Sequence, residues 1–148
     1  MTHQLNFIYN DSDWICPAEY PDLSKATEIA IDLETKDPNI KTKGPGWATF
    51  DGHIVGFAVA ALGQQWYFPI AHDAGGNMDL SITCAWMQDV LKTDATKIFH
   101  NASYDVGWLL VNGFEIRGKI VDTMIAAALI NENRFSFSLN ACAKDYLG

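Results

Sequence analysis

A strand-like stretch that carries two acidic residues constrains this chain more than any other feature. Apolar side chains occupy every second position at the start of Ile29–Thr35, which is typical of a largely buried β-strand. Asp32 and Glu34 lie two residues apart, and strand side chains alternate between the two faces of a sheet. Both carboxylates therefore project from the same face, and that face is not plain hydrophobic core.

Two interpretations of this acidic pair remain open on the stretch alone. Carboxylates held side by side raise each other's pKa unless a cation lies between them, and a hard divalent ion such as Mg²⁺ or Mn²⁺ prefers oxygen ligands. The alternative is a strand that runs out into solvent, with Asp32 capping a turn. The first interpretation predicts a metal site, and the second predicts none.

Composition limits the class of protein. With 148 residues and 49% hydrophobic content, the chain is expected to form one domain, residues 1–148. It has neither a basic, apolar leader nor a run of about 18 apolar residues, so we expect no membrane partner and a cytoplasmic location. The net charge of −8 argues against nucleic-acid binding through a general basic surface. It does not exclude an enzyme whose metal ions carry the positive charge.

Residues 36–52 follow the acidic strand, and their prolines and glycines predict a long loop without a regular element over most of its length. Compact domains rarely contain about 15 unstructured residues without a functional reason. Three of the chain's ten Lys and Arg residues fall here, Lys36, Lys41 and Lys43. The alternative is a solvated, variable insertion.

The remaining patterns predict an α/β fold. Residues 53–61 and 65–70 are expected to form a hairpin, and helices are expected near Leu80 with Ser81 as its cap, near Trp108 and after Asp122. Short strands are expected at residues 97–100 and 115–121. Strands followed by alternating helices and strands predict a mixed sheet with helical crossovers.

The stretch His100–Asp105 is the second informative one. Asn101 or Ser103 can cap the following helix, and Asn101 and Asp105, four residues apart, share a helix face that leans back towards the sheet. An acid at this place points at the end of the sheet. Alternatively, Asp105 is an ordinary surface acid near a helix N-terminus, where the helix dipole favours it.

Taken together, the motifs resemble those of a known family. Residues 31–35 (Ile-Asp-Leu-Glu-Thr) and 100–105 (His-Asn-Ala-Ser-Tyr-Asp) are similar to the first two motifs of 3′-to-5′ exonucleases with four acidic metal ligands. Residues 120–124 and 138–141 are similar to the family's usual continuation. The chain most closely resembles the proofreading domain of family A DNA polymerases, particularly phage-type ones, which implies a ribonuclease-H-like mixed sheet flanked by helices.

The resemblance also implies roles for individual residues. It identifies three acids as catalytic residues and ligands of two Mg²⁺ or Mn²⁺ ions: Asp32, Glu34 and Asp105. It identifies four residues that position the terminal nucleotide: Leu33, Thr35, Asn101 and Tyr104. We expect Lys41 and Lys43 to contact the sugar-phosphate backbone of the substrate.

The chain departs from the family at the third motif, which supplies a fourth acid and a general base. Nothing after Asp105 matches that motif, so we expect a fragment truncated at the C-terminus, with a polymerase domain in the same parent chain. The alternative is a degenerate relative, a non-catalytic nucleic-acid-binding or structural module of the same fold. The expected substrate is the 3′ end of single-stranded DNA, and the motifs do not exclude an RNA-trimming hydrolase.

Overall fold

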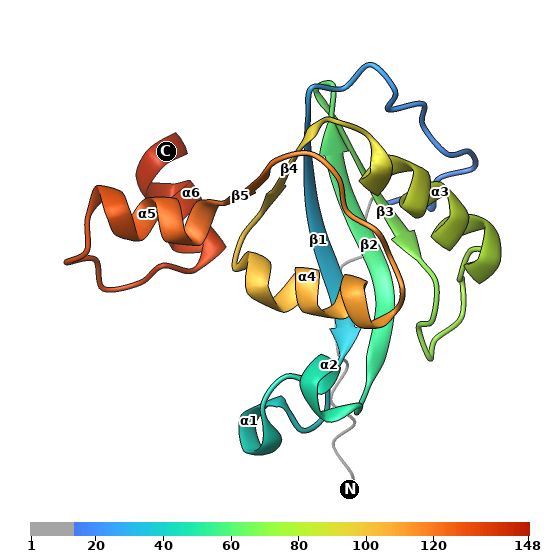
Figure 1. The fold of residues 1–148 in the computed structure, drawn as a ribbon, viewed down its shortest axis with the longest axis horizontal. Coiled ribbons are helices and arrows are strands. Elements are labelled where there is room, and N and C mark those ends of the chain that lie inside the picture. Colours follow the sequence, from blue (N-terminus) through green and yellow to red (C-terminus); the bar gives the residue numbers. More distant parts are fainter. Residues whose placement is uncertain (1–13) are drawn as a thin grey trace, which may run out of the picture.

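The computed structural model describes residues 14–148 and contains a five-stranded mixed sheet (Figure 1). The strands are β1 (Glu28–Lys36), β2 (His53–Ala61), β3 (Gln64–Pro69), β4 (Thr96–Phe99) and β5 (Ile120–Asp122). Their order in the sheet is β3-β2-β1-β4-β5. The three strands β1, β2 and β3 pair antiparallel, whereas β4 is parallel to both β1 and β5. The mixed sheet with helical crossovers expected from the sequence is confirmed.

Six helices accompany the sheet in the described residues. They are α1 (Ile40–Lys43), α2 (Gly46–Thr49), α3 (Leu80–Lys92), α4 (Ala102–Val111), α5 (Thr123–Ile130) and α6 (Leu139–Leu147). Two of them, α3 and α4, cover the same face of the sheet, while α5 and α6 extend sideways beyond β5 (Figure 1). None of the helices between residues 14 and 148 is long and apolar enough to cross a membrane.

The core lies between the sheet and the pair α3 and α4. Ile29, Ile31 and Leu33 of β1 are almost fully buried, as are Met87 of α3 and Leu109 of α4. Burying each such side chain contributes about 1.5–3 kcal/mol of hydrophobic stabilisation. Because strand side chains alternate, the other face of β1 points away from these helices.

The hairpin predicted from the sequence is confirmed in β2 and β3. Leu62 and Gly63 connect the strands and have φ angles of 53° and 73°. Positive φ at both central residues belongs to the two-residue turn whose twist matches that of the flanking strands. The turn fixes the register in which Ala58 faces Tyr67.

Two predicted elements differ in the structure. The cap of α3 is Asp79, whose carboxylate accepts a hydrogen bond from the Ile82 backbone N–H at 2.8 Å, whereas Ser81 lies inside the first turn. Strand β5 contains only three residues, rather than the predicted 115–121. The Arg117 backbone N–H donates to the Leu91 carbonyl of α3, and its carbonyl accepts from the buried Lys97 ammonium, so both backbone groups of this residue are hydrogen-bonded outside the sheet.

Residues 36–52 also contain more regular structure than predicted, since the one-turn helices α1 and α2 lie within them. The Gly46 backbone N–H donates to the Asp37 carboxylate at 2.8 Å. The Trp47 ring packs so closely on Gly107 of α4 that a Cβ there would lie 2.5 Å from it. A local hydrogen bond and an aromatic contact therefore attach this segment to α4.

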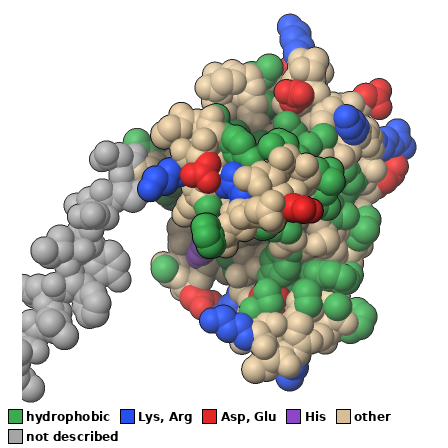
Figure 2. Space-filling view, turned by 90° about the vertical axis from the view of Figure 1, so that its left-hand side faces the viewer, with side chains coloured by type: hydrophobic (Ala, Val, Ile, Leu, Met, Phe, Trp, Pro, Cys, Tyr) green, Lys and Arg blue, Asp and Glu red, His purple; other side chains and the backbone are tan. Residues whose placement is uncertain are grey.

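The α5–α6 end of the molecule carries an exposed apolar surface. Viewed from that end, hydrophobic side chains occupy much of the surface (Figure 2). Leu129 and Ile130 of α5 are 83% and 71% exposed, and Leu147 of α6 is 86% exposed. Exposed apolar surfaces commonly mark interaction sites.

Candidate active site

The two acids of β1 project from the face of the sheet that α3 and α4 leave open. Asp32 and Glu34 are exposed, while the residues on either side of each are more buried. Their cross-strand partners on β2 are the small residues Ala58 and Gly56. Both carboxylates project from one face of the strand, as the sequence predicted, and the small neighbours leave them exposed there.

Asp105 joins them from α4. It lies in the first turn of that helix and is only 3% exposed. Strand β4 pairs with β1 only as far as Ala30. Beyond that point the Leu33 backbone N–H faces the Asp105 carboxylate and favours its ionised form.

The electrostatics couple the three acids. Burial, followed by the negative charge of Asp32, raises the pKa of Asp105 to about 7, and Asp122 and Glu34 add smaller contributions in the same direction. The hydrogen bond from the Leu33 N–H opposes the rise. Asp105 is thus a buried acid facing other acids, a state that a bound cation would relieve.

The surroundings of Asp32 also disfavour its ionised form. Partial burial of its carboxylate raises the pKa of Asp32, and His100 opposes the rise. Although Asp32 as a residue is exposed, it lines a cavity of about 800 Å³ on the open face of the sheet. The walls of this cavity displace part of the water around the carboxylate.

The donor chemistry of Asp32, Glu34 and Asp105 suits Mg²⁺ or Mn²⁺, which prefer carboxylate oxygens. Between residues 14 and 148, however, no group of three or more His, Cys, Asp and Glu side chains is arranged to hold a metal ion. The acids therefore share a region and influence one another's protonation without forming a ready-made cluster. Their residue types fit a divalent cation.

Asp122 organises the entrance to α4. As predicted, it is the N-cap of α5, and its carboxylate accepts from the backbone N–H groups of Met124 and Ile125. It also accepts from the backbone N–H groups of Asn101 and Ala102, at 3.1 and 2.8 Å. Burial opposes ionisation, yet the four hydrogen bonds together lower the pKa of Asp122. This second role was missed, although two parallel strands that end side by side could have suggested it.

Asn101 occupies the N-cap position of α4 but does not cap the helix with its side chain. Its backbone is left-handed, with φ of 69°, and its Oδ1 atom accepts from the Ser103 hydroxyl at 3.2 Å. Ser103 lies within the helix, so the predicted side-chain cap from either residue is wrong. Asp122 supplies the cap in their place.

Thr35 and Tyr104, both predicted to position a nucleotide, are joined to each other. The Tyr104 hydroxyl lies 2.8 Å from the Thr35 hydroxyl and donates to the Asp37 carboxylate at 2.9 Å. These hydrogen bonds connect the end of β1, the following segment and α4. The structure places both residues at the end of β1, where Thr35 directly follows Glu34 in the chain.

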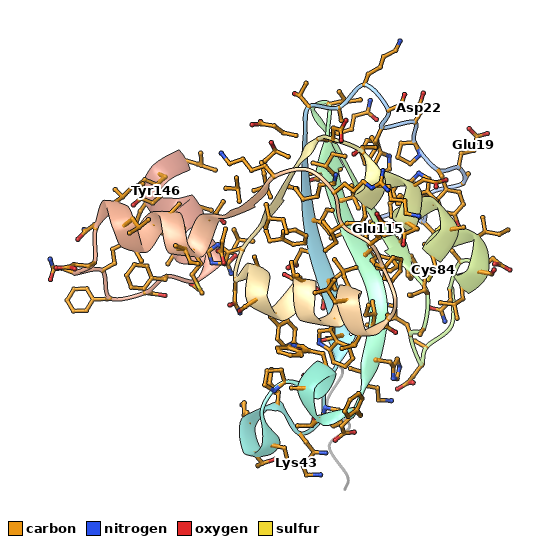
Figure 3. The ribbon with its side chains drawn as sticks, in the orientation of Figure 1. Glu19, Asp22, Lys43, Cys84, Glu115 and Tyr146 are labelled. Atoms are coloured by element: carbon orange, nitrogen blue, oxygen red, sulfur yellow. The ribbon has the colours of Figure 1, made fainter. Side chains whose placement is uncertain are left out.

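Leu33, Lys41 and Lys43 lie elsewhere. The Leu33 side chain is 6% exposed and belongs to the core, so only its backbone faces Asp105. Lys41 and Lys43 are exposed on α1. Lys43 points away from the sheet at the far end of the molecule (Figure 3). The structure does not bring these three side chains to the acids.

His100 has hydrogen bonds at both ring nitrogens. Its Nδ1 atom lies 2.9 Å from the Thr123 hydroxyl, and its Nε2 donates to the Phe137 carbonyl at 2.7 Å. It thereby connects the end of β4 with α5 and with the segment before α6. This is the role of a hydrogen-bonding histidine rather than that of a metal ligand.

A comparison with protein families decides the classification. A family model described as 3′-5′ exonuclease, of A-type DNA polymerases, matches residues 20–148. The chain belongs to this 3′-5′ exonuclease family. The family suggested by the two sequence motifs is confirmed.

Relatives of this chain include phage polymerases. It is 33% identical over 145 residues to a DNA-directed DNA polymerase of Pseudomonas phage M6, covering 93% of this chain and 22% of the relative. It is 30% identical over 132 residues to DNA polymerase DpoZ of Salmonella phage PMBT28, covering 88% of this chain and 19% of that relative. The chain spans about a fifth of the length of these relatives.

Solved structures share the fold of this chain. The POL domain of Pol1 from M. smegmatis superposes with a TM-score of 0.60 at 21% identity, over 84% of this chain and 19% of that one. Brucella melitensis NrnC with bound Mg²⁺ gives 0.60 at 20% identity, over 85% and 56%. Escherichia coli RNase D, an exoribonuclease, gives 0.58 at 18% identity, over 84% and 28%. The expected ribonuclease-H-like fold is confirmed.

Proposed function

We propose that this exonuclease is the proofreading region of a phage-type DNA polymerase and hydrolyses the terminal phosphodiester bond at the 3′ end of single-stranded DNA. The observation that carries the proposal is the buried Asp105 carboxylate, coupled to Asp32 and Glu34 and held by a β1 backbone N–H. The phage polymerase relatives support it, and a polymerase domain in the same parent chain is part of the proposal.

Asp32, Glu34 and Asp105 would hold the Mg²⁺ or Mn²⁺ ions, two in the complete site. Bound divalent cations supply an activated water and stabilise charge on the phosphodiester oxygens. Asp105 contributes a fixed, buried oxygen because α4 and the Leu33 N–H hold it. The exposed acids of β1 face the substrate side, and Tyr104 and Asn101 line the approach at the start of α4.

The segment after β1 would contact the substrate strand. Lys41 and Lys43 are exposed on α1 and suit phosphate contacts. Phe50 is 92% exposed and has a left-handed backbone with φ of 57°, which a bulky residue rarely adopts. An exposed aromatic side chain on a constrained backbone suits stacking on an unpaired base. Trp47, by contrast, is engaged with Gly107.

Two other functions are testable against this one. RNA trimming is favoured by the fold shared with RNase D, an exoribonuclease involved in structured RNA processing. A non-catalytic nucleic-acid-binding module is favoured by the absence, within residues 14–148, of a ready-made cluster of three metal ligands. We further propose a single domain across the chain and a location in the cytoplasm of the infected bacterium.

The proposal can be tested in the full-length protein with labelled DNA and RNA oligonucleotides of matched sequence. We expect Mn²⁺-dependent shortening of the DNA from its 3′ end, abolished by Asp32→Ala. Glu28→Ala, which removes an exposed acid at the other end of β1, is the matched control and should leave the rate unchanged. Faster degradation of RNA would support trimming instead, and binding without shortening would support a non-catalytic module.

A further inference from the structure

Tyr67 of β3 lies on the same face of the sheet as the acids of β1. Directly paired residues of adjacent strands share a face, and Asp32 pairs with Ala58, which in turn pairs with Tyr67. Only the methyl group of Ala58 stands between the acid and the phenol ring. The ring therefore has room to lean across β2 towards β1.

The contacts of Gly56, which has no side chain, locate the Tyr67 hydroxyl. Gly56 is the cross-strand partner of Glu34. A Cβ built on Gly56 would lie 2.1 Å from the Tyr67 hydroxyl oxygen and 2.4 Å from the ring carbon that carries it. The hydroxyl thus occupies the space of the missing side chain, directly beside Glu34.

The charge of Glu34 acts on this hydroxyl. Burial, and then the negative charge of Glu34, raise the pKa of Tyr67 to about 12. A tyrosine hydroxyl can donate one hydrogen bond and accept another.

His72 contacts the phenol of Tyr67 through a hydrogen bond and a ring contact. The Tyr67 hydroxyl and His72 Nε2 are hydrogen-bonded, and the two rings meet edge to face with centroids 5.8 Å apart. The Asn77 side chain makes two hydrogen bonds, of 2.7 and 2.9 Å, to the His72 backbone. Asp73 forms an ion pair of 2.8 Å with Lys36 at the end of β1. The loop after β3 is therefore attached to the strand that carries the acids.

We propose that Tyr67 is a positioning residue of the exonuclease site: His72 Nε2 donates to its oxygen, and its O–H donates to the Glu34 carboxylate, holding that carboxylate in the orientation that binds a divalent cation. Tyr67 acts from the β3 side, whereas Asp105 approaches from α4. The inference rests on the proposed function and adds two residues to which the motifs assign no role.

Tyr67→Phe tests the hydroxyl because the ring remains. Partners that orient a metal ligand typically contribute 10- to 100-fold in affinity or activity. In the full-length protein, we expect Tyr67→Phe to lower Mn²⁺ affinity, measured by calorimetry, and kcat on a single-stranded oligonucleotide by about 10- to 100-fold. KM and Tm should not change. Tyr20→Phe is the matched control, since it removes a hydroxyl that lies 2.7 Å from the Thr83 hydroxyl on α3. It should change neither quantity.

A double-mutant cycle identifies the partner of the hydroxyl. If Tyr67 acts through Glu34, Tyr67→Phe adds no further loss of Mn²⁺ affinity in a Glu34→Gln background, whereas additive losses would overturn the inference. His72→Ala should reproduce the defect. His72→Gln should restore part of the affinity because its amide can still donate to the phenol, and equal defects in both variants would contradict the role assigned to His72.

The measurements separate this inference from the function on which it rests. Mn²⁺ binding without any shortening of oligonucleotides would refute the proposed function, while weaker binding by Tyr67→Phe would still support the positioning role. An active protein whose Mn²⁺ affinity and kcat are unaffected by Tyr67→Phe would overturn the positioning role and leave the function standing.

Discussion

Replacing Asp105 with Asn should stabilise the metal-free protein, and by an amount that grows with pH. The folded state raises the pKa of Asp105 from 3.8 to about 7, mainly by burial. Between these values the folded protein retains a proton that the unfolded chain has lost, so stability falls as pH rises through this window. Each pKa unit corresponds to about 1.4 kcal/mol, which gives a loss of about 4 kcal/mol by pH 8.

Asn keeps the shape of the side chain and an oxygen that can accept the Leu33 N–H, but it carries no charge. Urea unfolding in EDTA at several pH values between 4 and 8 measures the difference in unfolding free energy between the variant and the wild type. We expect almost no difference near pH 4 and a gain of up to about 4 kcal/mol for the variant at pH 8. The comparison is necessary because Asp32 and Asp122 also titrate, with their pKa values shifted in opposite directions.

Asp89→Asn, which removes an exposed carboxylate from α3, reports the general effect of one charge fewer. Mn²⁺ should reduce the difference in unfolding free energy between Asp105→Asn and the wild type at pH 8. The ion stabilises the ionised wild-type site, whereas the variant offers it one carboxylate fewer. Parallel stability curves for wild type and Asp105→Asn from pH 4 to 8 would refute the claim that a buried, coupled acid occupies this position.

Three further predictions concern the acids and the segment after β1. Asp32→Ala should abolish metal-dependent exonuclease activity but leave the metal-free Tm unchanged or higher, because it relieves repulsion; a Tm lowered by many degrees would make Asp32 a structural residue. Asp122→Ala should lower the free energy of unfolding in urea by about 2–3 kcal/mol, and Asp79→Ala by only about 1 kcal/mol. The first change leaves four backbone N–H groups without their acceptor, and the second leaves one. Equal losses of stability in the two variants would contradict this. Replacing Lys41 and Lys43 with Ala should weaken single-strand binding and reduce its salt dependence, each lost phosphate contact lowering the slope by about 0.7; an unchanged slope would make the segment a mere insertion.

The sequence was informative where local patterns alone decide the structure. Period-two alternation placed Asp32 and Glu34 on one face of a strand, because side-chain direction there depends only on sequence position. The hairpin followed from two β-rich runs separated by a short turn. For Asp105 the helix start left two positions open, one pointing at the end of the sheet and one on the surface, and only the family resemblance assigned it to the acids of β1; in the structure it is buried and coupled to Asp32.

The sequence was least informative where a distant residue decides. Arg117 lies in a stretch whose sequence pattern predicts a strand. Its backbone, however, is hydrogen-bonded to Leu91 and Lys97, and the strand begins only at Ile120. Leu33 belongs to the first motif, but the register of β1 turns its side chain into the core. The one-turn helix α2 packs Trp47 against Gly107 of α4, a contact that no local pattern reveals.

The arrangement of the acids depends on residues that need not touch a substrate. Asp122 holds the backbone at the start of α4, and that start determines where Asp105 meets β1. Tyr104 joins the same helix to Thr35 and Asp37, on the other side of the acids. Each of these side chains connects two elements far apart in the sequence, so a change in either should alter the position of Asp105 without removing any carboxylate from the site. In Tyr104→Phe we therefore expect Mn²⁺ affinity measured by calorimetry to fall while all three acids remain, and an unchanged affinity would mean that α4 is held in place by its core contacts alone.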